Sequence, residues 1–146
     1  MTKKKIDYTT RPATNLDYRY CYKLTKQNMF DLFCRHWGGW VSSAFRDDFN
    51  VDATTMILCG KRRIGYYSLK DEEEGLYLDN LQLSPLVQGK GIGTDILKTI
   101  LHCNKYKQIR LTTFSDNQAF YLYQKLGFVV TGRDKAMVYM KKCPIK

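Results

Sequence analysis

Three glycines at alternate positions, Gly89, Gly91 and Gly93, constrain the fold of this chain more than any other feature. Glycine reaches backbone conformations that other residues avoid, and it places no Cβ between the main-chain N–H groups and a ligand. A β-rich run, residues 76–84, precedes the glycines, and apolar side chains at helical spacing follow over residues 92–101. The sequence therefore predicts a strand, a tight bend and a helix in direct succession.

The predicted bend and helix together are suited to binding a phosphate group. The main-chain N–H groups of the bend and of the first helical turn would point to one place, where the helix dipole adds positive charge. Because the main chain would do the binding, the side chain of Lys90 is an accessory. The bend is not a Walker loop, and it is not the dinucleotide fingerprint, since Ile96 stands where its last glycine belongs. Taken alone, the glycines are also compatible with a simple turn.

The remaining sequence alternates between β-rich and helical patterns, without an internal repeat or a linker. The β-rich runs are residues 6–10, 54–59, 63–70, 76–84, 109–114, 128–131 and 136–140. Helical spacing begins at Leu16, with Asn15 as a candidate N-cap, and recurs over residues 29–33, 41–45, 92–101 and 115–126. We predict an α/β fold in which about four helices flank a mixed central sheet of six to seven strands.

The run from 76 to 84 carries an irregular apolar pattern. Leucines stand at 76 and 78 and then at 81 and 83, which is a slip of one residue against the period of two that a strand imposes. A β-bulge near Asp79 and Asn80 would produce this slip. The alternative is a strand that is covered on both faces, where the phase of the leucines carries no meaning.

The last predicted helix has recognisable ends. Ser115 and Gln118 fit the spacing of a capping box at its start. At its end, Gly127 occupies the position that favours a left-handed backbone, and Phe128 supplies the hydrophobic contact that follows it.

Length and composition exclude several classes of protein. A chain of 146 residues has the size of one domain, and its 44% of hydrophobic residues is enough for a core. No apolar run approaches the roughly 20 residues that cross a bilayer. No apolar segment follows the basic first residues, as it would in a secretory signal. We therefore expect a cytosolic protein without a membrane partner.

The net charge of +10, from 24 basic and 14 acidic residues, favours anionic partners. Nucleic acid, an anionic membrane and a phosphate-bearing cofactor all fit this charge, and so does a surface whose charge serves only solubility. The basic residues are spread along the chain and form no clustered basic and aromatic surface, which argues against nucleic acid.

The five cysteines are scattered and include no C-x-x-C pair, and the chain has only two histidines. Metal-binding sequences place such ligands at short, regular spacings. We expect no metal site, and we expect reduced thiols.

Two sequence motifs give a resemblance to a known family. Residues 88–93, Gln-Gly-Lys-Gly-Ile-Gly, match the Q-x-x-G-x-G loop of the GNAT family of acyl-CoA-dependent N-acetyltransferases. Residues 119–128 resemble the second signature of that family, A-x-x-x-Y-x-K-x-G-F. The resemblance covers residues 54–141 well and the first fifty only in the order of their elements. It implies a single GNAT N-acetyltransferase domain over residues 1–146, with a GNAT-type mixed sheet.

The resemblance also implies how acetyl-CoA would bind. The pyrophosphate would lie on the amides of the glycine bend, and the pantetheine arm would pair with the preceding strand like an extra strand. The cofactor-binding positions implied in this way are Leu81, Gln82, Leu83, Gln88, Gly89, Lys90, Gly91, Ile92, Gly93, Thr94, Asn117 and Tyr123. Asn117 falls one place after the usual asparagine of the family.

Catalytic roles follow from the same resemblance. Tyr123 falls on the tyrosine that protonates the leaving thiolate, and a main-chain N–H near Leu81 would stabilise the oxyanion. Asp79 is the candidate base; the alternatives are a carboxylate that caps irregular backbone and a chain of waters to solvent. Trp37 and Trp40 are candidates for the acceptor pocket, or else core residues.

The expected function is an N-acetyltransferase that moves an acetyl group from acetyl-CoA to a primary amine by direct attack in a ternary complex. We expect a small-molecule acceptor. The alternatives are a protein N-terminal or lysine acetyltransferase, or a non-catalytic module that binds acyl-CoA or nucleic acid on the same fold. A homodimer is left open.

Overall fold

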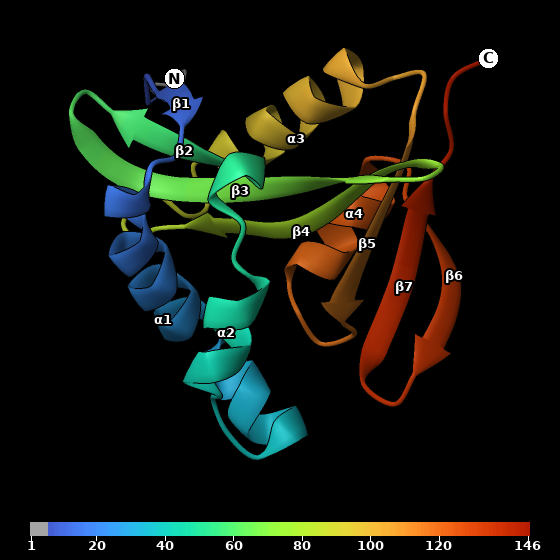
Figure 1. Cartoon of the computed structure of the whole chain (residues 1–146). Helices are drawn as coiled ribbons and strands as arrows, with labels where there is room; N and C mark the ends of the chain where they lie inside the picture. The colour runs from blue at the N-terminus through green and yellow to red at the C-terminus, as the bar shows by residue number, and fades with distance from the viewer. Residues whose placement is uncertain (1–5) are drawn as a thin grey trace. The chain divides into compact units, whose positions relative to one another are not determined.

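The computed structural model of this chain describes residues 6–146. Its strands are β1 (Thr9–Pro12), β2 (Thr54–Cys59), β3 (Arg62–Glu72), β4 (Gly75–Leu83), β5 (Gln108–Phe114), β6 (Val129–Asp134) and β7 (Met137–Lys142). Its α-helices are α1 (Tyr18–Trp37), α2 (Ser42–Asp48), α3 (Ile92–Cys103) and α4 (Ala119–Lys125), and Figure 1 traces all of these elements along the chain. Two short 3₁₀ helices, η1 (Asn15–Asp17) and η2 (Val51–Ala53), precede α1 and β2.

The seven strands form one mixed sheet in the order β1-β2-β3-β4-β5-β7-β6. The β1·β2, β2·β3, β5·β7 and β6·β7 pairs are antiparallel, whereas β4 and β5 are parallel. Parallel neighbours need a long connection, which α3 supplies between β4 and β5. The expected fold class, a mixed sheet of six to seven strands with about four helices, is confirmed.

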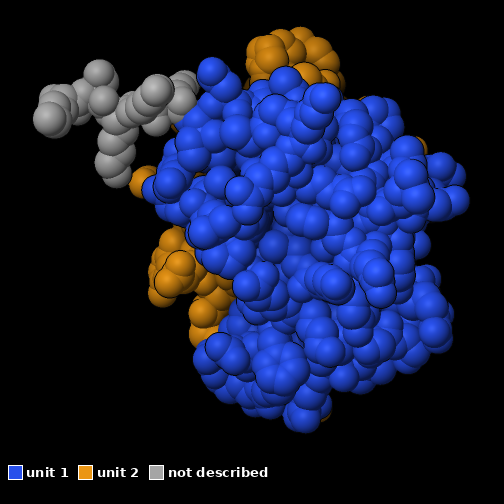
Figure 2. All heavy atoms as spheres, turned by 90° about the vertical axis from the view of Figure 1, so that its left-hand side faces the viewer, with its two compact units in different colours: residues 1–68, 80–93 blue, residues 69–79, 94–146 orange. Residues whose placement is uncertain are grey.

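The chain divides into two compact units, shown in blue and orange in Figure 2. Unit 1 comprises residues 1–68 and 80–93, of which 6–68 and 80–93 are described, and unit 2 comprises residues 69–79 and 94–146. Strands β3 and β4 pass from one unit to the other. The single functional domain over residues 1–146 stays a prediction.

In unit 1, α1 packs one face against the β2–β3 hairpin. Cys21 and Leu24, three residues apart and therefore on one side of the helix, join Met56 and Tyr66 in a buried cluster. The phenol of Tyr66 shares a hydrogen bond with the hydroxyl of Thr25, one further residue of this helix face. Three aromatic rings pack against the cluster: Tyr20 of α1, Phe45 of α2 and Phe49, which follows α2.

The start of unit 1 differs from the sequence-based expectation. The first strand is Thr9–Pro12 rather than residues 6–10, and Thr14 rather than Asn15 caps the helical segment. Thr14 and Asp17 form a capping box, in which the Asp17 carboxylate accepts from the Thr14 amide at 2.8 Å. The Thr-x-x-Asp pattern of residues 14–17 is the local signal for this cap, and the choice of Asn15 overlooked it.

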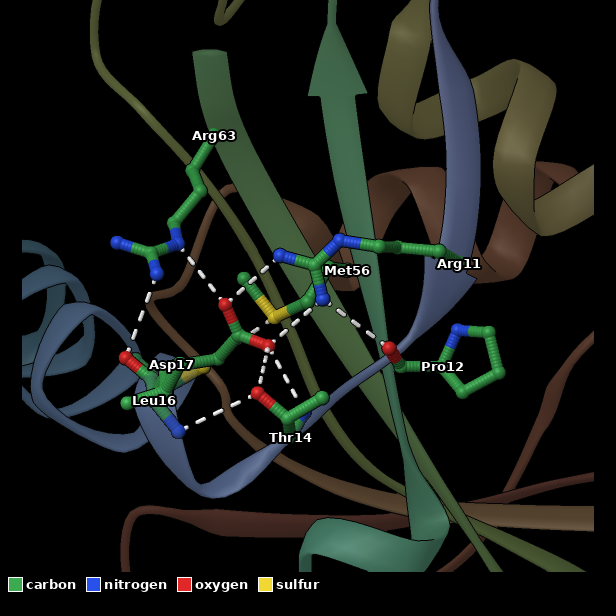
Figure 3. Close-up of polar contacts among 8 residues, drawn as sticks. Arg11, Pro12, Thr14, Leu16, Asp17, Met56 and Arg63 are labelled. Atoms are coloured by element: carbon green, nitrogen blue, oxygen red, sulfur yellow. Dashed lines mark hydrogen bonds and ion pairs between the residues drawn. The ribbon is translucent and has the colours of Figure 1, made fainter. Parts of the chain in front are cut away.

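Asp17 also joins three segments of unit 1 through its carboxylate, which is fully buried. Arg11 of β1 donates to both carboxylate oxygens, at 2.7 and 2.9 Å, and Arg63 of β3 donates to one of them at 2.9 Å. In Figure 3 the two guanidinium groups converge on this carboxylate. The hydrogen bonds from Arg11, with those from Thr14 and Arg63, hold the pKa of Asp17 well below its usual range despite burial.

In unit 2, the parallel pair places Gly75–Leu78 of β4 beside Gln108–Leu111 of β5. The buried side chains of this unit alternate along the strands, as the period of two requires. They include Leu76, Leu78, Ile109, Leu111, Thr113, Val138 and Met140, and Phe114 at the end of β5 is buried as well.

Burial along β4 follows its apolar residues only in part. Leu76, Leu78 and Gln82 are buried at even positions, while Leu81 and Leu83 are half-buried at odd positions. The strand is therefore covered on both faces, as the alternative interpretation of its leucines expects. The bulge near Asp79 and Asn80 stays a prediction.

Candidate functional site

The glycine bend has the backbone that its sequence predicts. Gly89 and Gly91 adopt left-handed conformations, with φ of 74° and 87°, and a Cβ at either position would meet no atom within 4 Å. Conformation, not crowding, therefore requires glycine at these two positions. Gly93 is different: its φ is not in this range, and its Cβ would lie 3.4 Å from the Leu83 side chain.

Hydrogen bonds within unit 1 hold the bend against the end of β4. The Gln88 side-chain amide donates to the Leu83 carbonyl at 2.9 Å, and the Val87 amide donates to the Ser84 carbonyl at 3.0 Å. Val87 and Ile92, one on each side of the bend, are buried. The anchored ends leave residues 88–91 exposed to solvent.

The helix α3 begins at Ile92, immediately after the bend. Its buried residues, Ile92, Ile96, Leu97 and Ile100, repeat at helical spacing and fix one face of the helix. The first N–H groups of a helix have no partner within it, so they are available to an anion. Residues 88–94 thus offer the main-chain donors that a phosphate site needs.

The end of β4 has a defined direction. The Ser84 amide donates to the Ile64 carbonyl of β3 at 2.8 Å, and the Gln82 carbonyl lies against Gly65 of β3. Successive main-chain groups of a strand point to opposite sides. The N–H and C=O groups of Leu81 and Leu83 therefore point away from β3, to the side on which a pantetheine arm would pair. The Leu83 carbonyl already accepts from Gln88 on that side.

Tyr123 lies on the buried face of α4 in unit 2, and 9% of its surface is exposed. Burial raises the pKa of its phenol to about 12, so the group is protonated at physiological pH. A proton donor needs this state. The structure places the ring in the core as well, in edge-to-face contact with Phe128.

Asn117 precedes α4 and uses its side-chain oxygen locally, where it accepts from the Ala119 amide at 3.1 Å. Gln118 stands at the N-cap without a side-chain bond. The capping box expected from Ser115 and Gln118 is therefore wrong. The side chain of Asn117 accepts from the first residue of α4 instead. A hydrogen bond from Asn117 to pantetheine would have to come from its Nδ2.

Asp79, the candidate base, pairs with a lysine in unit 2. Its carboxylate lies 3.3 Å from the Lys70 ammonium, and its side chain is 17% exposed. A structural role for this carboxylate is therefore visible, and its role as a base stays a prediction.

The two tryptophans at the end of α1 lie in an aromatic group with Phe33. The Phe33 ring stacks on Trp37 with centroids 4.7 Å apart and on Trp40 with centroids 5.2 Å apart. Trp40 donates from its indole nitrogen to the Tyr22 hydroxyl at 3.3 Å, and Trp37 is 58% exposed. Trp40 is thus held by packing, while more than half of the surface of Trp37 is exposed to solvent.

A hollow of about 530 Å³ in unit 2 lies elsewhere, at the turn between β3 and β4. It contains none of the predicted site residues. It is lined by Asp71, Glu72, Glu73, Glu74, Gly75, Tyr106, Lys107, Gln108 and Pro144.

Comparison with known proteins decides the family. Residues 24–144 match the family described as Acetyltransferase (GNAT) domain. The chain belongs to the GNAT family of acetyltransferases. A sequence comparison with curated proteins finds no match.

Solved structures support the same fold for this GNAT protein. It resembles the PaiA N-acetyltransferase of Thermoplasma acidophilum, solved in complex with coenzyme A, with a TM-score of 0.71 and 18% identity over 94% of this chain and 99% of that one. It resembles the ribosomal-protein-S18-alanine N-acetyltransferase of Escherichia coli with a TM-score of 0.72 and 14% identity over 96% of both chains. Naa50 of Arabidopsis thaliana, solved with the bisubstrate analogue CoA-Ac-MVNAL, gives a TM-score of 0.68 and 17% identity over 92% of this chain and 97% of that one.

One residue near the site was not expected from the sequence of this GNAT protein. Asn28 of α1 donates from Nδ2 to the Leu83 carbonyl at 2.9 Å and to the Gln82 side chain at 3.2 Å. No local pattern marks a contact between residues 55 positions apart. Only the packing of α1 on the sheet brings it to the end of β4.

Two further findings concern the described residues, 6–146, of this GNAT protein. No group of three or more His, Cys, Asp and Glu side chains among them is arranged to hold a metal ion. None of the helices in this range has both the length and the apolar character needed to cross a bilayer.

Proposed function

We propose that this GNAT protein transfers an acetyl group from acetyl-CoA to the nitrogen of a primary amine. The observation that carries the proposal is the exposed bend with two left-handed glycines that opens directly into α3. Such a bend fits a diphosphate bound by main-chain amides. The coenzyme A complexes among the structural neighbours support the same donor.

The reaction would proceed by direct attack in a ternary complex. The amine nitrogen attacks the thioester carbonyl, the oxyanion takes a hydrogen bond from a main-chain N–H near Leu81, and the C–S bond breaks. The thiolate takes a proton from the phenol of Tyr123, and the phenolate left behind takes a proton back from solvent. The amine loses its proton to Asp79 or to water.

The acceptor is proposed to be a small amine, with the exposed Trp37 at the end of α1 as part of its pocket. A flat aromatic surface can hold a cationic amine by a cation–π contact. A protein N-terminus is the second candidate, because the Escherichia coli neighbour is a ribosomal-protein-S18-alanine N-acetyltransferase and the Arabidopsis thaliana neighbour was solved with the bisubstrate analogue CoA-Ac-MVNAL.

The free thiols of the described residues favour a reducing compartment such as the cytoplasm.

The experiment that tests the proposal is a screen for amine-dependent release of coenzyme A from acetyl-CoA. Amino acids, polyamines, aminoglycosides and peptides with free N-termini would serve as acceptors, with mass spectrometry to identify the acetylated nitrogen. Turnover with a small amine supports the proposal, and turnover with peptides alone supports the second candidate. Binding of acetyl-CoA without turnover on any amine would favour a non-catalytic acyl-CoA module. Absence of acetyl-CoA binding, together with strongly salt-dependent binding to duplex DNA, would favour a nucleic-acid module.

A further inference from the structure

Two side-chain amides from separate elements of unit 1 donate to one main-chain oxygen, the carbonyl of Leu83. Asn28 Nδ2 reaches it from α1 and Gln88 Nε2 reaches it from the glycine bend, both at 2.9 Å. A carbonyl oxygen has two lone pairs, so these two donors fill its capacity. The same atom thereby connects α1 to the segment that begins the bend.

Asn28 is held in this position from a second side. Its Nδ2 also donates to the Gln82 side-chain oxygen at 3.2 Å, and the Gln82 side-chain nitrogen donates to the Asn80 side chain at 3.0 Å. Gln82 is buried, and Asn28 and Asn80 are half-buried. In this row of three amides, both donated contacts of Asn28 require an N–H group. An aspartate of the same shape could not replace it without facing two oxygen acceptors.

We infer that Asn28 is a positioning residue for the acyl donor, which it aligns through the carbonyl of Leu83. This inference rests on the proposed function, because it assumes that acetyl-CoA lies on the glycine bend and along the side of β4 that faces away from β3. Since the Leu83 carbonyl points away from β3 and is already filled, a pantetheine N–H is left to pair elsewhere on the strand. Asn28 thus sets the register in which the pantetheine arm pairs with β4. It also fixes the position of the Leu83 carbonyl, to which Gln88 donates.

The test replaces Asn28 with aspartate and measures the dissociation constant of acetyl-CoA by calorimetry from pH 5 to pH 8. At pH 8 the ionised carboxylate cannot donate and repels the Leu83 and Gln82 oxygens, so we expect affinity to fall about tenfold. At pH 5 part of the variant carries a protonated carboxyl, which can donate one hydrogen bond, so the ratio of variant to wild-type affinity should rise toward one. A merely structural defect would change melting temperature without this return of affinity.

Asn104→Asp is the matched control. Asn104 also donates from Nδ2 to a main-chain carbonyl, that of Ile100, at 2.8 Å, but at the end of α3 and far along the chain from the bend. It should change the melting temperature without changing acetyl-CoA affinity at any pH. Asn28→Ala removes both hydrogen bonds of the side chain without adding charge, and it should weaken acetyl-CoA binding at every pH. This second variant keeps the test decisive if Asn28→Asp does not fold.

The outcomes separate this inference from the proposed function. Weakened binding in both Asn28 variants, with recovery at low pH for the aspartate alone, supports the positioning role. If the wild-type chain binds acetyl-CoA and both folded Asn28 variants bind it equally well, the inference is overturned and the proposed function stands. If the wild-type chain does not bind acetyl-CoA at all, both fall together.

Discussion

The Phe128 amide donates to the Tyr123 carbonyl at 3.0 Å, and the two rings meet edge to face with centroids 5.7 Å apart. Between them Gly127 takes a φ of 100° and donates to the Gln124 carbonyl at 3.1 Å. These two bonds and the ring contact are the Schellman motif that ends a helix. The end of α4 therefore fixes the ring of Tyr123 by packing, independently of its hydroxyl.

Tyr123→Phe should lower turnover with little effect on stability or on acetyl-CoA affinity. Phenylalanine keeps the ring that packs on Phe128 and removes only the proton that we propose for the thiolate. Loss of a general acid typically costs about a hundredfold or more in rate. Steady-state kinetics, a thermal melt and calorimetry with acetyl-CoA would measure the three quantities.

Tyr121→Phe is the control for this substitution. Tyr121 lies two residues earlier on α4 but is 69% exposed, so the loss of its hydroxyl should leave turnover unchanged. Equal turnover in wild type and Tyr123→Phe would remove Tyr123 from the mechanism.

The raised pKa of Tyr123 also predicts the alkaline side of the pH profile. Because burial raises this pKa to about 12, the phenol keeps its proton well above the ordinary tyrosine value of about 10. Turnover should therefore show no loss attributable to Tyr123 between pH 8 and pH 10. A fall with an apparent pKa near 10 that is absent in a variant without the phenol would contradict this assignment.

Local patterns predicted the parts of the fold that local forces decide. The hairpin at residues 54–70, the glycine bend and the left-handed Gly127 each follow from a few adjacent residues, and the structure has all of them. The helix starts were predicted less well, because several polar residues compete for the same cap. The cap before α1 is Thr14 rather than Asn15, and the side chain that accepts from the start of α4 belongs to Asn117 rather than Ser115.

Contacts between distant residues left no trace in the sequence. The hydrogen bond from Asn28 to the Leu83 carbonyl, and the ion pair of Arg63 with the Asp17 carboxylate, join residues 55 and 46 positions apart and depend on how α1 and the segment before it pack on the sheet. The leucines of β4 carry little information on phase for a related reason, since a strand covered on both faces loses its alternation.

Gly91→Ala should weaken acetyl-CoA binding through the backbone alone. At a φ of 87° a Cβ costs about 1–2 kcal/mol, yet no neighbouring atom would meet it. The bend should relax away from its conformation, and the affinity for acetyl-CoA should fall about tenfold. Gly60→Ala adds the same strain, at a φ of 60° and also without a neighbour, in the β2–β3 turn. It should lose similar stability and keep its affinity. Unchanged binding in folded Gly91→Ala would argue against the bend as the diphosphate site.

Asp17→Ala should destabilise the fold by about 2 kcal/mol, because it removes the buried carboxylate that accepts from Arg11, Arg63 and the Thr14 amide, while the two arginines, 39% and 38% exposed, stay hydrated. The pKa of Asp17 is lower in the folded chain than in the unfolded one. Its contribution to stability is therefore complete above the unfolded value of about 4 and is lost as the pH falls below it. Urea titrations from pH 7 down to pH 3 should show a steeper loss for wild type than for Asp17→Ala. Asp52→Ala, an exposed control, should follow the wild-type curve; parallel curves for wild type and Asp17→Ala would exclude this linkage.

The thiols should divide into two classes in the native protein. Cys21 is fully buried, with its sulfur 3.7 Å from that of Met56, and burial raises its pKa to about 12. Thiolate is the reactive form, so Cys21 should resist alkylation until the chain unfolds. The exposed thiols, Cys34, Cys59, Cys103 and Cys143, should react with iodoacetamide in the folded state. Mass spectrometry should find four modified cysteines without denaturant and five with it. Rapid labelling of Cys21 at neutral pH would show that α1 separates from β2 in solution.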